Sequence, residues 1–234
     1  MNNTGKLFGV GVGPGDPELL TMKAVRVIKS ADVIFTAAST KNTYSLAVEI
    51  ASPYISPDVP VNILSFPMTK DMDIAEAAWT ENAEVIAETL KQGRNAVFLT
   101  LGDPTTYSTF GYILKKMKCV MPHADIETIP GITSFHAASA RLNRILVEGE
   151  ESLLITSGAF GGHRIRNVDG VENVAIVKAY KNIKDINQAL KDTGLYKKSV
   201  AVSKCGRENE KIISDIGELE DRKPDYWTLI LASK

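Results

Sequence analysis

Three times in the first half of this chain, an apolar run stops abruptly at glycine and proline, and a more polar stretch follows. The runs are 7–12, 96–101 and 126–129, and the breaks after them are 13–17, 102–104 and 130–134. Apolar runs of this length are typical of strands in a parallel sheet that helices cover on both faces. Ligands of such sheets bind beyond the carboxyl ends of the strands. The pattern therefore predicts an α/β fold with three loops along one rim that form a ligand site.

The rest of the chain fits two α/β domains. In the first half we expect strands at 7–12, 33–35, 61–64, 96–101 and 126–129, alternating with helices at 17–29, 45–51, 74–92, 105–117 and 133–141. In the second half we expect strands at 153–156, 174–177, 200–204, 211–216 and 228–232, and one helix at 183–193. The closely spaced late strands favour a mixed sheet. A polar, acidic stretch at 142–151 suggests a boundary, so we predict a parallel-sheet N-terminal domain at 1–144 and a mixed-sheet C-terminal domain at 145–234.

The break after residue 101 is the first place to expect chemistry. Asp103 suits a helix N-cap, and Pro104 suits the first helical position, where its missing N–H goes unused. Glycine and hydroxyl residues there, from Gly102 to Ser108, suit close backbone approach to a small polar ligand. Tyr107 is placed either to stack on that ligand or to pack beneath the strand.

The sequence excludes several common classes of protein. The glycines at 9, 11, 13 and 15 do not fit G-x-G-x-x-G, and no P-loop motif occurs. A formal net charge of −1 provides no basic face for nucleic acid. The two cysteines, Cys119 and Cys205, make no metal-binding motif. No apolar run could cross a membrane and the polar start MNNTGK is unlike a signal peptide, so we expect a cytoplasmic protein with no membrane partner.

The segments GVGPGDPELLTMKA, LTLGDPTTYST and PGITS, in this order, resemble the tetrapyrrole (corrin/porphyrin) methyltransferases, which use S-adenosyl-L-methionine. Residues 66–71 (FPMTKD), the Ala78-Trp79 pair and SFHAASARLNRILVEGEE are similar to one branch, the precorrin-2/cobalt-factor II C-20-methyltransferases of cobalamin biosynthesis. The resemblance runs along essentially the whole chain. It implies two α/β domains with the cofactor in the cleft between them, a trough for the tetrapyrrole and a homodimer.

The resemblance also implies roles for particular residues. The cofactor-binding residues would be Gly102, Asp103, Thr106, Tyr107, Ser108, Thr133 and Ser134, with Ser157, Ser203, Trp227 and Thr228 from the second domain. The substrate trough would include Pro14, Gly15, Asp16, His136 and Arg164. No metal site is expected. Uroporphyrinogen-III methyltransferases carry an Asp shortly after the second strand, where this chain has Thr36-Ala37, so the catalytic base stays unassigned, with Tyr107 and Asp103 as candidates.

Other interpretations stay open at this point. His136 is as consistent with a structural or surface histidine as with the trough, and Arg164 with a solvated basic loop. The acceptor is cobalt-factor II or metal-free precorrin-2, with the cobalt form favoured. Another methyltransferase of the same superfamily, acting on a different tetrapyrrole position or a diphthine-type substrate, is the nearest alternative. A nicotinamide-dependent oxidoreductase and a noncatalytic ligand carrier are the alternatives from other classes.

Overall fold

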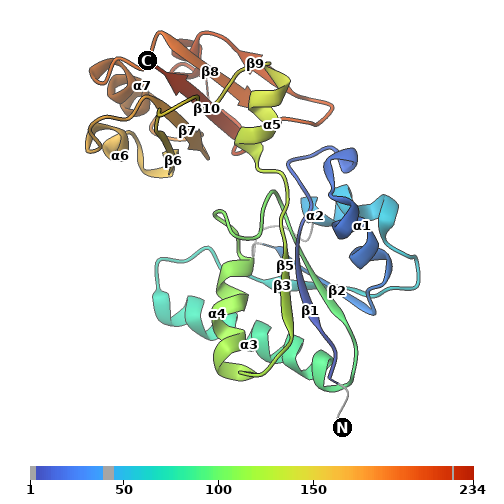
Figure 1. Ribbon diagram of the computed structural model, residues 1–234. Helices are drawn as coiled ribbons and strands as arrows, with labels where there is room; N and C mark the ends of the chain where they lie inside the picture. Colours follow the sequence, from blue (N-terminus) through green and yellow to red (C-terminus); the bar gives the residue numbers. More distant parts are fainter. Residues whose placement is uncertain (1–3, 39–44, 223) are drawn as a thin grey trace. The chain divides into compact units, whose positions relative to one another are not determined.

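The computed structural model describes residues 4–38, 45–222 and 224–234. The chain divides into two compact units, Met1–Thr133 and Ser134–Lys234 (Figure 1). The predicted boundary after residue 144 lies later in the chain than this division. The reason is the helix α5 (Ser134–Arg141), which packs against two strands of the second unit, β7 and β10. Residues 134–144 therefore belong to the second unit.

The first unit is built on a five-stranded sheet in which every pair of neighbours is parallel, as predicted. Its strands are β1 (Leu7–Gly11), β2 (Val33–Ala38), β3 (Val61–Ser65), β4 (Ala96–Thr100) and β5 (Ile126–Ile129). They lie in the order β3-β2-β4-β1-β5. Because β4, β1 and β5 are neighbours and run the same way, the loops at their carboxyl ends share one rim.

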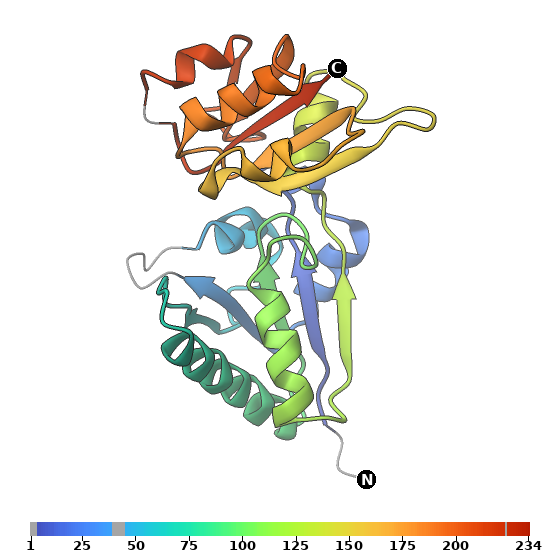
Figure 2. The same ribbon diagram turned by 90° about the vertical axis from the view of Figure 1, so that its left-hand side faces the viewer.

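Helices cover both faces of this sheet (Figure 2). On one face are α3 (Met72–Lys91) and α4 (Phe110–Val120), and on the other are α1 (Met22–Lys29) and α2 (Leu46–Ala51). Among the described residues, this unit also contains two short 3₁₀ turns, Pro17–Leu19 and Ser52–Tyr54. Alternation along β4 sends Phe98 into the core under α3 and α4, and Val97 and Leu99 into the opposite core. This two-sided burial explains why β4 is apolar from Ala96 to Leu99 and why every residue of it, including Thr100, is buried.

Local capping sets where these helices begin. The Thr21 hydroxyl accepts a hydrogen bond from the Ala24 N–H at 3.1 Å, so α1 starts at Met22 after a separate 3₁₀ turn. The Asp71 carboxylate caps α3 in the same way. The prediction that a helix begins at residue 105 is wrong, because α4 starts only at Phe110. Tyr107, with a φ of +51°, lies off the helical path, and the Ser108 hydroxyl accepts the Phe110 N–H at 3.1 Å.

The second unit contains a mixed sheet, which confirms the predicted fold class. Its strands are β6 (Leu153–Ser157), β7 (Asn173–Val177), β8 (Lys198–Ser203), β9 (Lys211–Ile213) and β10 (Thr228–Ser233). The order is β6-β7-β10-β8-β9, with β6 and β7 parallel and the other pairs antiparallel. The strand β10 therefore occupies the centre of the sheet, although it comes last in the sequence among the five strands.

Three helices of the second unit flank this sheet. The helices α6 (His163–Arg166) and α7 (Ile183–Asp192) pack together over its core, and α5 contacts β7 and β10 (Figure 1). Two 3₁₀ turns, Gly158–Phe160 and Ile216–Leu219, complete the unit. Over the residues that the structure describes, no helix is both long enough and apolar enough to cross a membrane.

Candidate active site

The three predicted rim loops of the first unit are joined by hydrogen bonds. Gly13, after β1, and Gly102, after β4, form an isolated antiparallel bridge with N···O distances of 3.2 and 2.8 Å. Gly131, after β5, donates its backbone N–H to the Asp103 carboxylate at 3.0 Å. The loops therefore form one connected structure, although the sequence separates them by many residues.

Glycine is required where these loops meet. A Cβ atom on Gly131 would lie 2.1 Å from the Gly102 carbonyl oxygen, and one on Gly11 would lie 2.5 Å from the same atom. Contacts this short with backbone cannot be relieved by a side-chain rotation. Gly11 and Gly131 thus allow the backbones of these loops to approach the Gly102 carbonyl group more closely than any other residue type would permit.

The Asp103 side chain is only 8% exposed and lies at the centre of this junction. One carboxylate oxygen accepts the Thr105 N–H at 2.8 Å and the Thr105 hydroxyl at 2.5 Å, and the other accepts the Gly131 N–H. Burial alone would raise the pKa of Asp103, but the hydrogen bonds from Thr105, Gly131 and Thr106 outweigh it and hold the pKa below its ordinary value. The carboxylate is therefore ionised at neutral pH and its oxygens are already engaged.

The residues after Asp103 include an exposed aromatic side chain and several hydroxyl side chains. Tyr107 is 52% exposed and has a left-handed backbone (φ +51°), a conformation that costs energy for a side chain of this size and is common at functional sites. The Ser108 hydroxyl is 2.8 Å from that of Thr100, so it supports the turn. Thr106 and Thr133 are partly exposed.

Gly102 faces open space. It has a φ of +69°, and a Cβ atom built there would find only one heavy atom within 4 Å, the Ile132 carbonyl oxygen at 4.0 Å. A glycine that needs a left-handed backbone and borders an unfilled space can admit a ligand close to the main chain. The turn after β4 thus leaves room for a small ligand next to its backbone.

Thr36, in β2, cannot take the part of the Asp that uroporphyrinogen-III methyltransferases carry near this point. It is 1% exposed, and its hydroxyl lies 2.6 Å from that of Ser45 and 3.5 Å from the Leu99 carbonyl oxygen. The Thr36 side chain is therefore committed to joining β2, β4 and the start of α2.

In the second unit, the predicted cofactor residues share one rim of the mixed sheet. Ser157 ends β6, Ser203 ends β8, and Thr228 begins the antiparallel β10 opposite Ser203. The Thr228 hydroxyl donates to the Ser203 hydroxyl at 3.1 Å, and both residues are buried. Trp227, 38% exposed, packs its ring edge-on against Tyr226.

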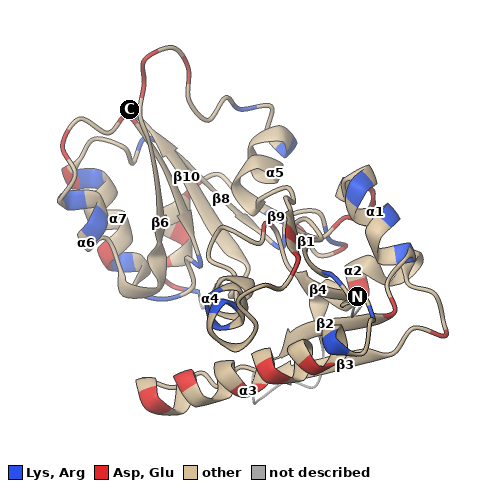
Figure 3. Cartoon of the chain, turned by 60° about the horizontal axis from the view of Figure 1, so that its bottom comes forward, with Lys and Arg blue, Asp and Glu red and all other residues tan. Residues whose placement is uncertain are grey.

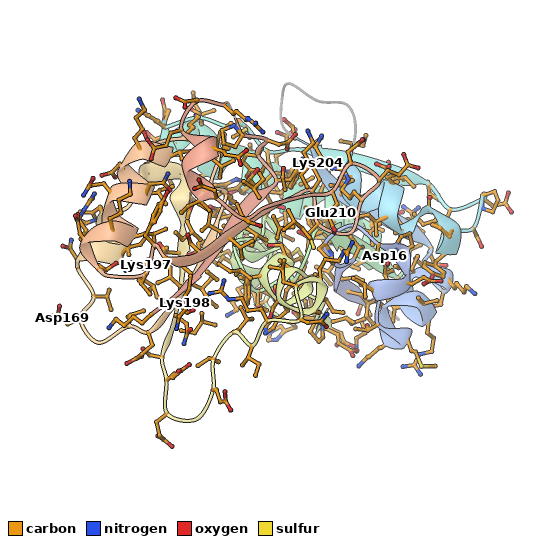
Figure 4. All side chains as sticks on the ribbon, turned by 90° about the horizontal axis from the view of Figure 1, so that it is seen from above. Asp16, Asp169, Lys197, Lys198, Lys204 and Glu210 are labelled. Atoms are coloured by element: carbon orange, nitrogen blue, oxygen red, sulfur yellow. The ribbon has the colours of Figure 1, made fainter. Side chains whose placement is uncertain are left out.

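The residue directly after β8 adds charge at this rim. Lys204, labelled in Figure 4, has a φ of +55° and forms an ion pair with Asp225 at 3.2 Å. Its backbone N–H donates to the Trp227 carbonyl oxygen, which ties the end of β8 to the residue before β10. Sequence reasoning missed Lys204, because its pairing with Asp225 depends on which strands are neighbours.

The predicted trough residues lie on both units. Pro14, Gly15 and Asp16 (labelled in Figure 4) come after β1, and the Asp16 carboxylate caps the first 3₁₀ turn by accepting the Glu18 N–H at 2.9 Å. His136, on α5, and Arg164, on α6, are both exposed on the second unit. Pro14, Gly15 and Asp16 therefore lie in the first of the three rim loops. The assignment of all five residues to the trough stays a prediction.

A groove that the sequence did not reveal lies between α3, α4 and the loop after β3. Its volume is about 630 Å³, and its walls include Phe66, Met68 and Met72. The rings of Trp79 and Tyr112 stack within it, 3.9 Å apart. Acidic residues are spread along α3 beside it (Figure 3). The first four residues of the FPMTKD segment, Phe66–Thr69, thus line the same groove as Trp79.

Comparison with protein families agrees with this arrangement. Residues 6–220 match the model of the Tetrapyrrole (Corrin/Porphyrin) Methylases, and the chain belongs to this family. It is 36% identical to a probable cobalt-precorrin-2 C(20)-methyltransferase of Methanocaldococcus jannaschii, over 98% of this chain and 96% of that protein. It is 30% identical to a precorrin-2 C(20)-methyltransferase of a Sinorhizobium species, over 97% of this chain and 94% of that protein.

A solved structure shares the fold. The uroporphyrin-III C-methyltransferase of Thermus thermophilus, complexed with S-adenosylhomocysteine, matches with a TM-score of 0.72 at 20% identity, covering 98% of this chain and 92% of that one. At this level of identity the match supports the two-unit α/β architecture and leaves the individual contacts to be established in this chain.

Proposed function

We propose that this chain is an S-adenosylmethionine-dependent methyltransferase that methylates C-20 of cobalt-factor II or precorrin-2 in cobalamin biosynthesis. The observation that carries this proposal is similarity along nearly the full chain to proteins named for that reaction, at 36% and 30% identity. The connected loops at the rim of the first sheet support it, because they present glycine backbone and an open space where a cofactor can bind.

The chemistry needs little from side chains. S-adenosylmethionine supplies an activated methyl group: its carbon–sulfur bond breaks, the sulfur keeps the electron pair, and the meso carbon of the tetrapyrrole forms the new carbon–carbon bond. The meso carbon then loses a proton. The protein's tasks are to align the two reactants and to exclude water. Gly102 and its neighbours would hold the cofactor through the backbone, and Thr133, Ser134 and the rim of the second unit would contribute the remaining contacts.

Two finer features belong to this proposal. The acceptor is cobalt-factor II in preference to precorrin-2, in keeping with the name of the M. jannaschii relative. The enzyme works in the cytoplasm as a homodimer. Analytical ultracentrifugation of the purified chain tests the dimer, and a monomer at micromolar concentration would contradict it.

The decisive experiment is anaerobic incubation of the purified protein with S-adenosylmethionine that carries a labelled methyl group. Cobalt-factor II, precorrin-2 and uroporphyrinogen III are supplied separately, and mass spectrometry tracks the label. We expect the label on the first two, at C-20, and none on the third. Label on uroporphyrinogen III alone would assign the chain to a different reaction of the family.

A binding titration separates this function from the oxidoreductase alternative. We expect S-adenosylhomocysteine to bind with a micromolar or lower Kd and NADH not to bind. Calorimetry that detects NADH binding and no binding of S-adenosylhomocysteine would overturn the proposal.

A further inference from the structure

The tripeptide Gly-Asp-Pro occurs twice in this chain, and its aspartate makes different hydrogen bonds in the two places. In Gly15-Asp16-Pro17 and in Gly102-Asp103-Pro104, the carboxylate accepts the N–H two residues later, at 2.9 Å from Glu18 and 2.8 Å from Thr105. The recorded hydrogen bond of Asp16 stays within its own turn, whereas Asp103 also crosses to another loop and accepts the Gly131 N–H at 3.0 Å.

We propose that Asp103 is a positioning residue, which fixes the loop after β5 against the turn after β4 and so sets the shape of the cofactor site. This inference rests on the proposed function for its ligand, but its structural part concerns Asp103 and Gly131 alone. It assigns to Asp103 neither the transfer of the proton from the meso carbon nor any other chemical step.

The surroundings of Gly131 explain why such a tie is needed. This residue is pressed so closely against Gly11 and Gly102 that no side chain fits, and hence no apolar packing can hold it in place. A hydrogen bond to its backbone N–H from an ionised carboxylate is a strong alternative. Without it, the N–H would lose its partner in a crowded, partly buried place, which is costly.

The same geometry makes Asp103 unsuitable as a base. Its oxygens accept hydrogen bonds from the N–H groups of Thr105 and Gly131 and from the hydroxyls of Thr105 and Thr106, and its exposed fraction is 8%. To take a proton from a substrate carbon, the carboxylate would have to give up the contacts that hold the two loops together. An acceptor already stabilised in its ionised form also has little tendency to bind a proton.

The test compares Asp103→Asn with the control variant Asp71→Asn. In the native protein, the Asp71 carboxylate caps α3 by accepting the N–H groups of Asp73 and Ile74, and both of these contacts are local. Asparagine caps helices as well as aspartate, so the control keeps its affinity for S-adenosylhomocysteine. In Asp103→Asn, the new side chain has only one oxygen. Its NH₂ group, which is a donor, must therefore face the N–H group of either Thr105 or Gly131, which is also a donor. We expect at least a tenfold rise in Kd and faster hydrogen exchange at the Gly131 amide. Turnover at saturating cofactor should stay within about threefold of the wild type, with an unchanged pH profile.

A second variant strains the same contact from the other side. Gly131→Ala pushes the loop away from Gly102 without altering the carboxylate, so it too should raise the Kd. The effects of Asp103→Asn and Gly131→Ala on the Kd should not be additive in the double variant, because both substitutions break the same hydrogen bond between Asp103 and Gly131. If Asp103→Asn does not fold, Gly131→Ala must show the raised Kd with retained turnover, or the proposal fails.

The opposite result is equally clear. A fall in turnover of about 100-fold or more at saturating cofactor, with unchanged affinity, would make Asp103 the base and overturn the proposal. Exchange at the Gly131 amide needs no ligand. If the wild type fails to bind S-adenosylhomocysteine while Asp103→Asn still speeds this exchange, the proposed function fails and the structural tie stands. If exchange at Gly131 is unaltered, the tie is refuted whatever the ligand.

Discussion

Gly102 combines a left-handed backbone with an open space beside it that a ligand could occupy. Gly102→Val places a branched side chain on a backbone with a φ of +69° and fills the open space beside it. The strain should lower the free energy of unfolding by about 1–3 kcal/mol, and filling the space should weaken binding of S-adenosylhomocysteine by roughly one to two decades. Calorimetry and urea unfolding measure the two effects separately.

Gly170→Val is the matched control for this prediction. Gly170 has a φ of +76° and no heavy atom within 4 Å of a built Cβ, and it lies in a loop outside the predicted site. It should lose similar stability and keep its affinity. Equal affinity in Gly102→Val and the wild type would remove the β4 turn from the cofactor site.

At the residue scale, the sequence predicted interactions between residues close together in the chain. It did not predict interactions between residues far apart in the chain. The sequence indicated that Asp103 accepts hydrogen bonds in a tight turn, since Asp before Pro at the end of an apolar run is a local signal. Its bond to Gly131 could not be foreseen, because β5 becomes a neighbour of β1 only in the folded sheet. The same applies to the ion pair between Lys204 and Asp225.

Among the elements, β5 lies at the edge of the first sheet and carries a charge cluster. Glu127 pairs with Lys23 and, at 2.9 Å, with Lys6, and these contacts lower the pKa of Glu127 to about 2. Because the folded pKa lies below the ordinary 4.5, the pairing stabilises the fold above pH 4.5, and this contribution is lost as the pH falls towards 2. NMR titration of the Glu127 carboxyl should show this pKa.

The variant Glu127→Gln checks the link to stability. It should be less stable than the wild type at pH 6, with the difference shrinking as the pH falls from 4.5 to 2. The charged groups are partly exposed to solvent, so salt should weaken the effect. A difference that is the same at pH 6 and pH 2 would show that lost charge pairing is not its cause.

The segment after α5 is anchored by Arg144. Its guanidinium donates to the Lys198 carbonyl oxygen at 2.7 Å, to the Ser233 hydroxyl at 2.8 Å and to the Leu231 carbonyl oxygen at 3.4 Å. Arg144→Met removes these bonds and keeps most of the apolar stem, so the free energy of unfolding should fall by about 1–3 kcal/mol. Urea unfolding, with Arg141→Met as the exposed comparison, measures this loss.

The start of α4 shows why element boundaries were harder to predict than elements. Pro104 is compatible with a first helical turn, and the sequence predicted one. The carboxylate of Asp103 bonds to Gly131 as well as to its own turn, and the left-handed Tyr107 then separates that turn from the helix at Phe110. A tertiary contact thus overrides a local preference.

For the whole molecule, the proposed cofactor contacts come from both units. S-adenosylhomocysteine at 100 times its Kd should stabilise the protein by about 2.7 kcal/mol. Hydrogen exchange should slow near Gly102 in the first unit and near Ser203 and Thr228 in the second. Protection confined to the first unit would remove Ser157, Ser203, Trp227 and Thr228 from the set of cofactor residues.

The central position of β10 has a consequence for synthesis on the ribosome. The strands β7 and β8 pair with β10 on its two sides, and residues 228–233 leave the ribosome after all the other strands. The parallel sheet of the first unit can form before β10 is available. In the second unit, β7 and β8 then each lack their β10 partner and leave an unpaired edge. Until residues 228–233 have left the ribosome, these edges are open to other chains, so the nascent protein is most prone to aggregate in that interval.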